Sequence, residues 1–380
     1  MSKKLFVLAG EVSGDMHAAG VIAELLKAMP GLKVVGIGGQ KLRSLGAELL
    51  YDTAQMSIMG FVDVLKHAGF LRRVIRDLKQ MIRRENPQAA FLVDYPGMNL
   101  MMAHFFHELG IPVIYYISPQ VWAWKEGRVK AIRRDVDRLL VIFDFEVEFF
   151  RRHGINAEFV GHPVIEQLAE HTIPSRDLFF RSYNLAPETR LIGLLPGSRK
   201  QEIAHILPEM LKASRLLSWK YPAVFLLGRA PHLDQGVYNM LSDYRDLTIV
   251  NCGAYEVMQN SDLALVTSGT ATLETLCFGC PMVVVYKTGA LNYMIGRRLV
   301  KLKNISLANI VAKGLGSSER AVPELIQHEA NGQEIFRQAE MILENPALAA
   351  SMRQELLAAR DRLAGRSPSN TIAAIVQEYL

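Results

Sequence analysis

The stretch LIGLLPGSRKQEI, Leu191 to Ile203, contains an apolar run that ends abruptly at Pro-Gly-Ser-Arg. The run LIGLL is typical of a buried strand, and EIAHILPEMLKASRLL after it has apolar residues at helical spacing. Gly197, Ser198 and Arg199 are therefore expected at a strand-to-helix corner. A helix N-terminus carries partial positive charge and unpaired N–H groups, and an arginine adds a planar donor for phosphate oxygens. This corner is predicted to bind a phosphate.

Apolar strand-like runs alternate with helix-like stretches along the whole chain. The runs are KLFVLAG, KVVGIGG, AAFLVDY, PVIYYIS and RLLVIF in the first part, then LIGLLPG, AVFLLG, LTIV, LALVTS and MVVVYK in the second. Continuous apolar strands between amphipathic helices indicate parallel sheets that are covered on both faces. The sequence therefore predicts an α/β protein with two doubly wound, Rossmann-like domains.

A polar, proline-containing stretch at roughly residues 162–190 separates the two series of strands. We expect an N-terminal domain over residues 1–165, a second domain over residues 166–350, and C-terminal helices over residues 351–380 that pack back towards the first domain. The length of 380 residues suits two domains that share a cleft.

The composition limits which cellular compartments and which binding partners are compatible with the chain. The net charge of +5 is compatible with nucleic acid, an anionic membrane or an anionic substrate, and charge alone does not choose among them. Three cysteines favour a reducing compartment over a disulfide framework. The N-terminal MSKKLFVLAGEVSGD reaches Gly-Glu too early for a signal peptide, and no apolar segment approaches the length of a membrane span. A cytoplasmic protein is expected.

Ligands of open parallel sheets bind beyond the carboxyl ends of the strands, so the corners after strands are candidate sites. The corner LAGEVSGD carries Glu11 and Ser13 before a helix expected near Met16, and the alternative is a turn with a capping Ser or Asp. At the corner FLVDYPGMN, Asp94 ends an apolar strand, where a carboxyl pKa rises and the group can accept a proton from an alcohol. A helix-capping role for Asp94 is equally compatible with the sequence.

A fourth corner, TSGTATLETLCFGCP, opens a helix with Ser268, Gly269 and Thr270. Glu274 lies one turn after Thr270 on the same face, so a hydroxyl and a carboxylate can hold phosphate and ribose hydroxyls respectively. Ala271, three residues before Glu274, has no hydroxyl, so the pair is not a capping box. The second domain is therefore predicted to hold a nucleotide, and the first domain the group that attacks it.

Two further motifs bear on the site. SPQVWAW places Trp122 and Trp124 after a strand, where they line a site for apolar or sugar groups or fill the domain junction; we favour the site. The D-x-D of Asp135 and Asp137 precedes a strand, which is the wrong end of the sheet for a metal that assists sugar transfer. No metal and no cofactor are expected.

The segment FVDVLKHAGFLRRVIRDLKQMIRR, residues 61–84, mixes lysines and arginines with large apolar residues. Preceded by the apolar MSIMG, it suits the surface of an anionic bilayer. A surface helix with a solvated basic face explains the same pattern equally well.

These motifs together resemble the lipid-A-disaccharide synthases, bacterial glycosyltransferases that join two acylated glucosamine units. The resemblance covers nearly the whole chain. Its collinear motifs are AGEVSGD (9–15), GGQKLRSLGAE (38–48), SIMGFVDVL (57–65), VDYPGMN (93–99), YYISPQVWAW (115–124), FVGHP (159–163), LLPGSRKQEI (194–203), SGTATLE (268–274) and SLANIVA (306–312).

The resemblance implies a GT-B fold, in which two Rossmann-like domains face a cleft. It implies UDP-2,3-diacylglucosamine as donor and 2,3-diacylglucosamine 1-phosphate (lipid X) as acceptor. Asp94 matches the family's proposed general base, and Asn309 matches an asparagine required for activity. Arg199 and Glu274 match positions that contact the nucleotide.

The resulting hypothesis is a metal-independent, inverting displacement that yields a β-1,6-linked disaccharide 1-phosphate and UDP. The expected partners are the two sugar substrates and the cytoplasmic face of the inner membrane, with no nucleic acid. The sequence leaves a monomer and a homodimer open. Two alternatives remain: a UDP-amino-sugar epimerase or hydrolase, and a non-catalytic, membrane-associated nucleotide-sugar binder.

Overall fold

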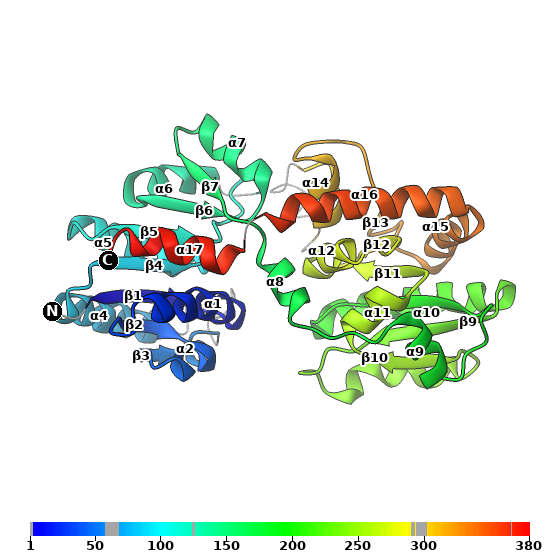
Figure 1. Cartoon of the computed structure of the whole chain (residues 1–380). Helices are drawn as coiled ribbons and strands as arrows, with labels where there is room; N and C mark the ends of the chain where they lie inside the picture. The colour runs from blue at the N-terminus through cyan, green and yellow to red at the C-terminus, as the bar shows by residue number, and fades with distance from the viewer. Residues whose placement is uncertain (1–2, 58–67, 124–125, 290–292, 294–301, 366) are drawn as a thin grey trace. The chain divides into compact units, whose positions relative to one another are not determined.

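The computed structural model describes residues 3–57, 68–123, 126–289, 293, 302–365 and 367–380. The chain forms two compact units (Figure 1). Unit 1 comprises Met1–Glu166 and Leu363–Leu380, and unit 2 comprises Gln167–Arg362. Helices α8 (Pro163–Ala169) and α16 (Pro346–Ala364) each carry the chain across a boundary between the units.

Unit 1 is built on a parallel sheet with the strand order β3-β2-β1-β4-β5-β6-β7. Its strands are β1 (Lys4–Ala9), β2 (Lys33–Gly38), β3 (Glu48–Asp52), β4 (Ala89–Val93), β5 (Val113–Tyr116), β6 (Arg138–Val141) and β7 (Ala157–Phe159). Its other elements are α1 (Val12–Ala28), α2 (Gln40–Ser44), α3 (Thr53–Ser57), α4 (Ala68–Glu85), α5 (Pro96–Glu108), η1 (Glu126–Arg128), α6 (Val129–Asp135), α7 (Asp144–Arg152) and α17 (Pro368–Gln377).

Unit 2 is built on a second parallel sheet with the order β10-β9-β8-β11-β12-β13. Its strands are β8 (Arg190–Leu195), β9 (Ala223–Gly228), β10 (Ile249–Cys252), β11 (Leu263–Thr267), β12 (Met282–Tyr286) and β13 (Glu324–Ile326). Its other elements are α9 (Arg176–Ser182), α10 (Lys200–Lys220), η2 (Gln235–Tyr244), α11 (Ala254–Asn260), α12 (Thr270–Cys277), α14 (Leu307–Lys313) and α15 (Gly332–Glu344).

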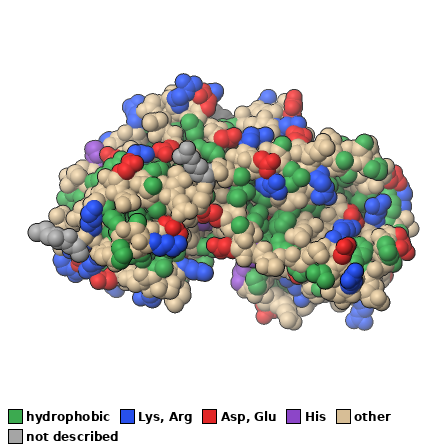
Figure 2. All heavy atoms as spheres, viewed as in Figure 1, with side chains coloured by type: hydrophobic (Ala, Val, Ile, Leu, Met, Phe, Trp, Pro, Cys, Tyr) green, Lys and Arg blue, Asp and Glu red, His purple; other side chains and the backbone are tan. Residues whose placement is uncertain are grey.

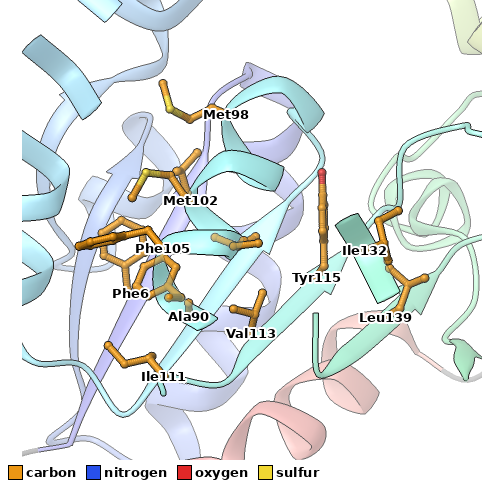
Figure 3. Close-up of a cluster of buried hydrophobic side chains, with 14 of the residues drawn as sticks. Phe6, Ala90, Met98, Met102, Phe105, Ile111, Val113, Tyr115, Ile132 and Leu139 are labelled. Carbon is orange, nitrogen blue, oxygen red and sulfur yellow. The ribbon is translucent and has the colours of Figure 1, made fainter. Parts of the chain in front are cut away.

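Both faces of the first sheet are buried, which explains why its strands are continuous apolar runs. Phe6 and Leu8 of β1 belong to one core cluster, and Leu5 and Val7 belong to the cluster on the other face. Charged side chains of both signs are instead interspersed over the visible surface (Figure 2). Figure 3 shows the first cluster, in which the rings of Phe6 and Phe106 lie 5.0 Å apart between centroids.

The α/β fold with two parallel sheets is confirmed, and every strand expected from an apolar run is present. Three strands were not expected: β3, β7 and β13, which are short, contain acidic residues and lie at sheet edges. Helix α1 begins at Val12, four residues before the expected Met16, because Glu11 already occupies the N-cap position. Ser13 therefore lies in the first turn of a helix and not in a loop.

The C-terminal segment returns to unit 1 through α17, which packs along α1 (Figure 1). The Glu166 carboxylate accepts hydrogen bonds from the hydroxyls of Ser367 (2.6 Å) and Ser369 (2.7 Å), and thus holds the start of α17. The segment that returns to unit 1 begins at Leu363, and not at the expected residue 351. Most of α16 belongs to unit 2.

Each sheet contains one point at which the strand order reverses direction. The reversal lies between β1 and β4 in unit 1 and between β8 and β11 in unit 2. Register pairs Ala9 with Val93 and Leu195 with Val266, so the two corners at each reversal begin side by side. Crevices at such switch points are where open parallel sheets bind ligands.

Replacing Gly36 by alanine should destabilise unit 1. Its φ is +148°, and a Cβ at this position would lie 1.8 Å from the carbonyl oxygen of Val7. We expect Gly36→Ala to lower the free energy of unfolding by about 2–4 kcal/mol, measured by urea denaturation. Gly31→Ala is the matched control, because a Cβ there meets no atom within 4 Å. Equal stability of the two variants would contradict the close β1–β2 approach.

Candidate functional site

The corners after β1 and β4 lie against each other at the unit 1 switch point. A Cβ built on Gly10 would lie 2.4 Å from Cδ1 of Tyr95, so the tyrosine ring covers the glycine backbone. Only glycine allows this approach. It brings the exposed Glu11 at the start of α1 next to the turn that contains Asp94.

Asp94 is the first residue of a strained turn between β4 and α5. Its φ is +48° and that of Tyr95 is +45°, both in the left-handed region that non-glycine residues avoid. The backbone N–H of Asp94 donates to the carbonyl oxygen of Tyr116 at 2.9 Å. Tyr95 occupies the N-cap of α5, so Asp94 does not sit at the cap position that the alternative interpretation requires.

The carboxyl group of Asp94 is half-buried and has a perturbed acidity. Burial raises its pKa to about 6, the negative charge of Glu11 adds to this rise, and a hydrogen bond to the backbone of Tyr95 opposes it. A carboxylate with a pKa near the working pH is suited to taking up a proton.

The remaining polar residues at the start of α1 have different surroundings. Ser13 is exposed in the first turn of the helix. Asp15 is buried and accepts hydrogen bonds from the amides of Gly39 (2.6 Å) and Lys41 (3.0 Å), so its carboxylate caps α2. Asp15 therefore has a structural role.

Trp122 is held by a buried carboxylate that the sequence analysis did not single out. Its indole N–H donates to Oε1 of Glu146 at 3.0 Å, and the Ser118 hydroxyl donates to the same oxygen at 3.2 Å. Burial raises the pKa of Glu146 to about 7. Glu146 thus ties the corner after β5 to the start of α7. Trp124, also predicted to line the site, lies outside the described residues.

The corner after β8 carries the predicted phosphate donors, and they already bind an anion. The amides of Ser198 and Arg199 each donate to Oε2 of Glu202 at 3.3 Å, and the Arg199 guanidinium donates to Oε1 at 3.0 Å. Gly197 has a φ of +112°, and a Cβ there would lie 2.6 Å from Glu202 Oε2. Glu202 was missed, although a Glu at the third position of a helix is a known capping signal.

The corner after β11 opens the N-terminus of α12. Ser268 is half-buried, while Gly269 and Thr270 are exposed, and the N-cap makes no side-chain hydrogen bond to this helix end. One turn later the half-buried Glu274 accepts a hydrogen bond from the Tyr255 hydroxyl at 3.1 Å, and burial raises its pKa. The corner therefore presents helix N–H groups and one nearby carboxylate.

Three residues that were not predicted lie at or after the ends of strands in unit 2. Within the described residues, the Oγ1 of Thr267 and the Nε of Arg229 are buried without a hydrogen-bond partner. The Nε2 of His232 lies 3.0 Å from the carbonyl oxygen of Ser198. Buried polar atoms normally have partners, so the two orphaned atoms leave a free acceptor or donor at these strand ends.

Asn309 is fully buried and uses all its hydrogen-bonding capacity inside unit 2. Its Nδ2 donates to Val322 O (2.9 Å) and Glu324 Oε1 (2.8 Å). Its Oδ1 accepts from the amides of Ala321 (2.7 Å) and Val322 (3.0 Å). Asn309 therefore fixes the segment before β13 to α14, and it has no polar atom left for a substrate.

The described part of the chain offers no metal site and no membrane-spanning helix. It contains no group of three His, Cys, Asp or Glu side chains that could hold a metal ion. The D-x-D residues are otherwise occupied: Asp135 pairs with Arg134 at 2.7 Å, and Asp137 accepts from the Val113 amide at 2.8 Å. None of the helices in the described ranges combines the length and apolarity needed to cross a membrane.

Sequence comparisons place the chain among known proteins. The family model described as lipid-A-disaccharide synthetase matches residues 5–376. The lipid-A-disaccharide synthase of Geobacter sulfurreducens is 41% identical over 384 residues, which is 100% of this chain and 98% of that protein. Those of Syntrophus aciditrophicus and Myxococcus xanthus are 39% and 37% identical, over 95% and 99% of this chain and 94% and 97% of those proteins.

Solved structures share the architecture at low sequence identity. CalG4, the calicheamicin glycosyltransferase, has a TM-score of 0.60 at 14% identity, over 100% of this chain and 98% of that chain. Acinetobacter baumannii MurG has a TM-score of 0.58 at 14% identity, over 100% of both chains. A UDP-GlcNAc 2-epimerase from Neisseria meningitidis bound to UDP-GlcNAc has a TM-score of 0.55 at 15% identity, over 99% of both chains. These likenesses show the fold alone, and they confirm the GT-B class.

Removing the charge of Glu11 should make Asp94 a stronger acid. Glu11→Gln takes away the negative charge that disfavours a second carboxylate, so the pKa of Asp94 should fall from about 6 by roughly half a unit to one unit. The fall should be partial because burial, the larger cause, remains. Carboxyl carbon NMR measures the titration directly.

Glu24→Gln is the control for this titration, because it removes the same charge from the same helix at a position paired with Lys27. We expect it to leave the pKa of Asp94 unchanged. If Glu11→Gln behaved like Glu24→Gln, the two carboxylates at the switch point would not interact.

Proposed function

The chain belongs to the lipid-A-disaccharide synthase family of UDP-sugar glycosyltransferases, and on this premise we propose that it transfers 2,3-diacylglucosamine from UDP to lipid X. The acceptor is 2,3-diacylglucosamine 1-phosphate, and the products are the β-1,6-linked disaccharide 1-phosphate and UDP. The observation that carries the proposal is Asp94, a half-buried carboxyl group with a raised pKa at the unit 1 switch point.

Asp94 serves as the general base in this proposal. It takes the proton of the acceptor's 6-hydroxyl as that oxygen attacks the anomeric carbon of the donor. A single displacement inverts the configuration at that carbon. With a pKa of about 6, Asp94 is mostly ionised at neutral pH and still binds a proton more tightly than an ordinary aspartate does.

Unit 2 receives the leaving UDP in this proposal. The amides of Ser198 and Arg199 and the Arg199 guanidinium transfer from the Glu202 carboxylate to the diphosphate, since both are anions that suit the same donors. The N-terminus of α12 adds further N–H groups, and Glu274 accepts hydrogen bonds from the ribose. These donors stabilise the charge that develops on UDP, without a metal ion in the step.

We also propose that unit 1 contacts the anionic cytoplasmic face of the inner membrane through α4. The apolar side of this helix is used by the core, where Val74, Leu78 and Ile82 are fully buried. Its outer side forms a groove of about 350 Å³ lined by Arg72, Ile75, Arg76, Lys79, Gln80 and Arg83. The proposed attraction of α4 is therefore electrostatic. The apolar segment at residues 58–67 lies outside the described residues.

The products of one reaction test the proposal against its alternatives. Purified protein is incubated with UDP-2,3-diacylglucosamine and lipid X, and UDP and disaccharide are quantified. We expect them in equal amounts, with a β-linkage by NMR. UDP without disaccharide would indicate a hydrolase or epimerase, and the absence of both would indicate a nucleotide-sugar binder.

Two substitutions separate the base from the phosphate site. Asp94→Asn should reduce turnover by a factor on the order of 10²–10⁴ while UDP affinity in calorimetry stays unchanged, because the base is removed and unit 2 is intact.

Arg199→Ala should reduce turnover on the order of a hundredfold or more and also weaken UDP binding. Arg245→Ala, at another exposed position of unit 2, is the control. Near-normal turnover of Asp94→Asn would refute the assigned base.

Vesicle sedimentation tests the membrane proposal. Arg72→Glu/Arg83→Glu should reduce binding to vesicles of phosphatidylglycerol and phosphatidylethanolamine on the order of tenfold or more at low salt, since each cation near an anionic surface contributes about 1 kcal/mol. The effect should shrink at high salt. Arg245→Glu/Arg353→Glu changes the net charge equally at exposed positions of unit 2 and should bind normally. Equal losses in both variants would show that α4 is not the contact.

A further inference from the structure

The backbone is strained directly after two neighbouring strands, β4 and β5, the first of which leads into the turn with Asp94. Asp94 and Tyr95 after β4 have φ values of +48° and +45°, and Ile117 directly after β5 has a φ of +59°. A left-handed conformation is especially unfavourable for a β-branched residue such as isoleucine. Such strain persists only where surrounding contacts determine the backbone, and it is often found at functional sites.

Two buried side chains determine the backbone at this turn. The carbonyl oxygen of Asp94 accepts hydrogen bonds from Nδ2 of Asn99 (2.5 Å) and from the hydroxyl of Tyr115 (2.8 Å). The same Nδ2 donates to the carbonyl oxygen of Val93 at 3.1 Å. Together with the Asp94 N–H bond to Tyr116, these contacts fix both peptide groups of Asp94.

Asn99 holds this position at an energetic cost to the fold. Within the described residues its Oδ1 is buried without a hydrogen-bond partner, and burying an unpaired polar atom is unfavourable. The amide cannot be reversed, because two carbonyl oxygens require the nitrogen on their side. The two hydrogen bonds of its nitrogen therefore set the orientation of this side chain.

Tyr115 reaches the turn from β5 through the core. It has no exposed surface, and Figure 3 shows its ring rising from the strand with the hydroxyl oxygen at the far end. Neither this residue nor Asn99 has exposed surface, so neither is accessible to a substrate.

We propose that Asn99 and Tyr115 are positioning residues that aim the Asp94 carboxylate by clamping its carbonyl oxygen in the left-handed turn. This inference rests on the proposed function, in which Asp94 is the base. Releasing the clamp lets the turn relax towards ordinary torsion angles and moves the carboxylate away from its burial beside Glu11. A displacement of about 1 Å at a reacting group is enough to cost on the order of a hundredfold in rate.

The test compares two adjacent tyrosines. Tyr115→Phe removes only the hydroxyl that binds the Asp94 carbonyl, so kcat should fall on the order of tenfold to a hundredfold, with the KM for the UDP-sugar and the affinity for UDP within about twofold of normal. Tyr116→Phe removes an equally buried hydroxyl from the opposite face of β5, and should keep its kcat. Asn99→Ala is the second variant and should behave like Tyr115→Phe.

The pH profile separates positioning from a general loss of stability. Loosening the turn exposes Asp94, which lowers its pKa, so the acid limb of kcat/KM should move to lower pH in Tyr115→Phe and stay in place in Tyr116→Phe. An unchanged limb together with an unchanged kcat would overturn the clamp. Melting temperatures of all variants show whether a lower rate merely reflects unfolding.

The double variant Asp94→Asn/Tyr115→Phe distinguishes failure of the clamp from failure of the proposed function. If Tyr115 acts through Asp94, the double variant should turn over no more slowly than Asp94→Asn alone. A further loss by the same factor would show that Tyr115 acts independently and would overturn the clamp. Normal turnover of Asp94→Asn would instead overturn the base, whatever Tyr115→Phe does.

Discussion

The reversal of strand order within each sheet is the constraint on which the site depends. Parallel strands joined by helices carry the chain outward in one direction from β1 and in the other from β4, and likewise from β8 and β11. At these points the connections that follow two neighbouring strands run in opposite directions and leave a crevice. Elsewhere successive crossover helices pack side by side. Asp94 and Gly197 are therefore placed by topology before any side-chain contact is considered.

Close packing at the corners then sets the chemistry of individual groups. At the first switch point the ring of Tyr95 covers Gly10, and burial together with the charge of Glu11 raises the pKa of Asp94. At the second, Gly197 lets the Glu202 carboxylate approach the amides of the following turn. In both cases the absence of a side chain on the glycine lets a neighbouring side chain approach its backbone.

The sequence predicted every interior strand of both sheets but only one of the four edge strands, β10. Continuous apolar runs such as AAFLVDY identify strands buried on both faces, whereas β7 reads Ala-Glu-Phe and resembles a loop. The positions of Asp94 and Arg199 at corners after strands could be predicted, because one residue directly follows an apolar run and the other lies four residues beyond one. Tyr115 could not, because VIYY indicates only a core strand, and the register that brings its hydroxyl to Asp94 is a tertiary property.

The charges at the two corners support the proposal that unit 1 supplies the base and unit 2 binds the phosphates. The Asp94 corner already holds two carboxyl groups, since the charge of Glu11 raises the pKa of Asp94. A leaving diphosphate would be repelled there, whereas a proton is attracted. The corner after β8 offers backbone amides and a guanidinium that bind the Glu202 carboxylate, so it is already organised around an anion. Exchanging the roles of the two corners would oppose the charge at each, which supports the proposed assignment of the base to unit 1 and of the phosphates to unit 2.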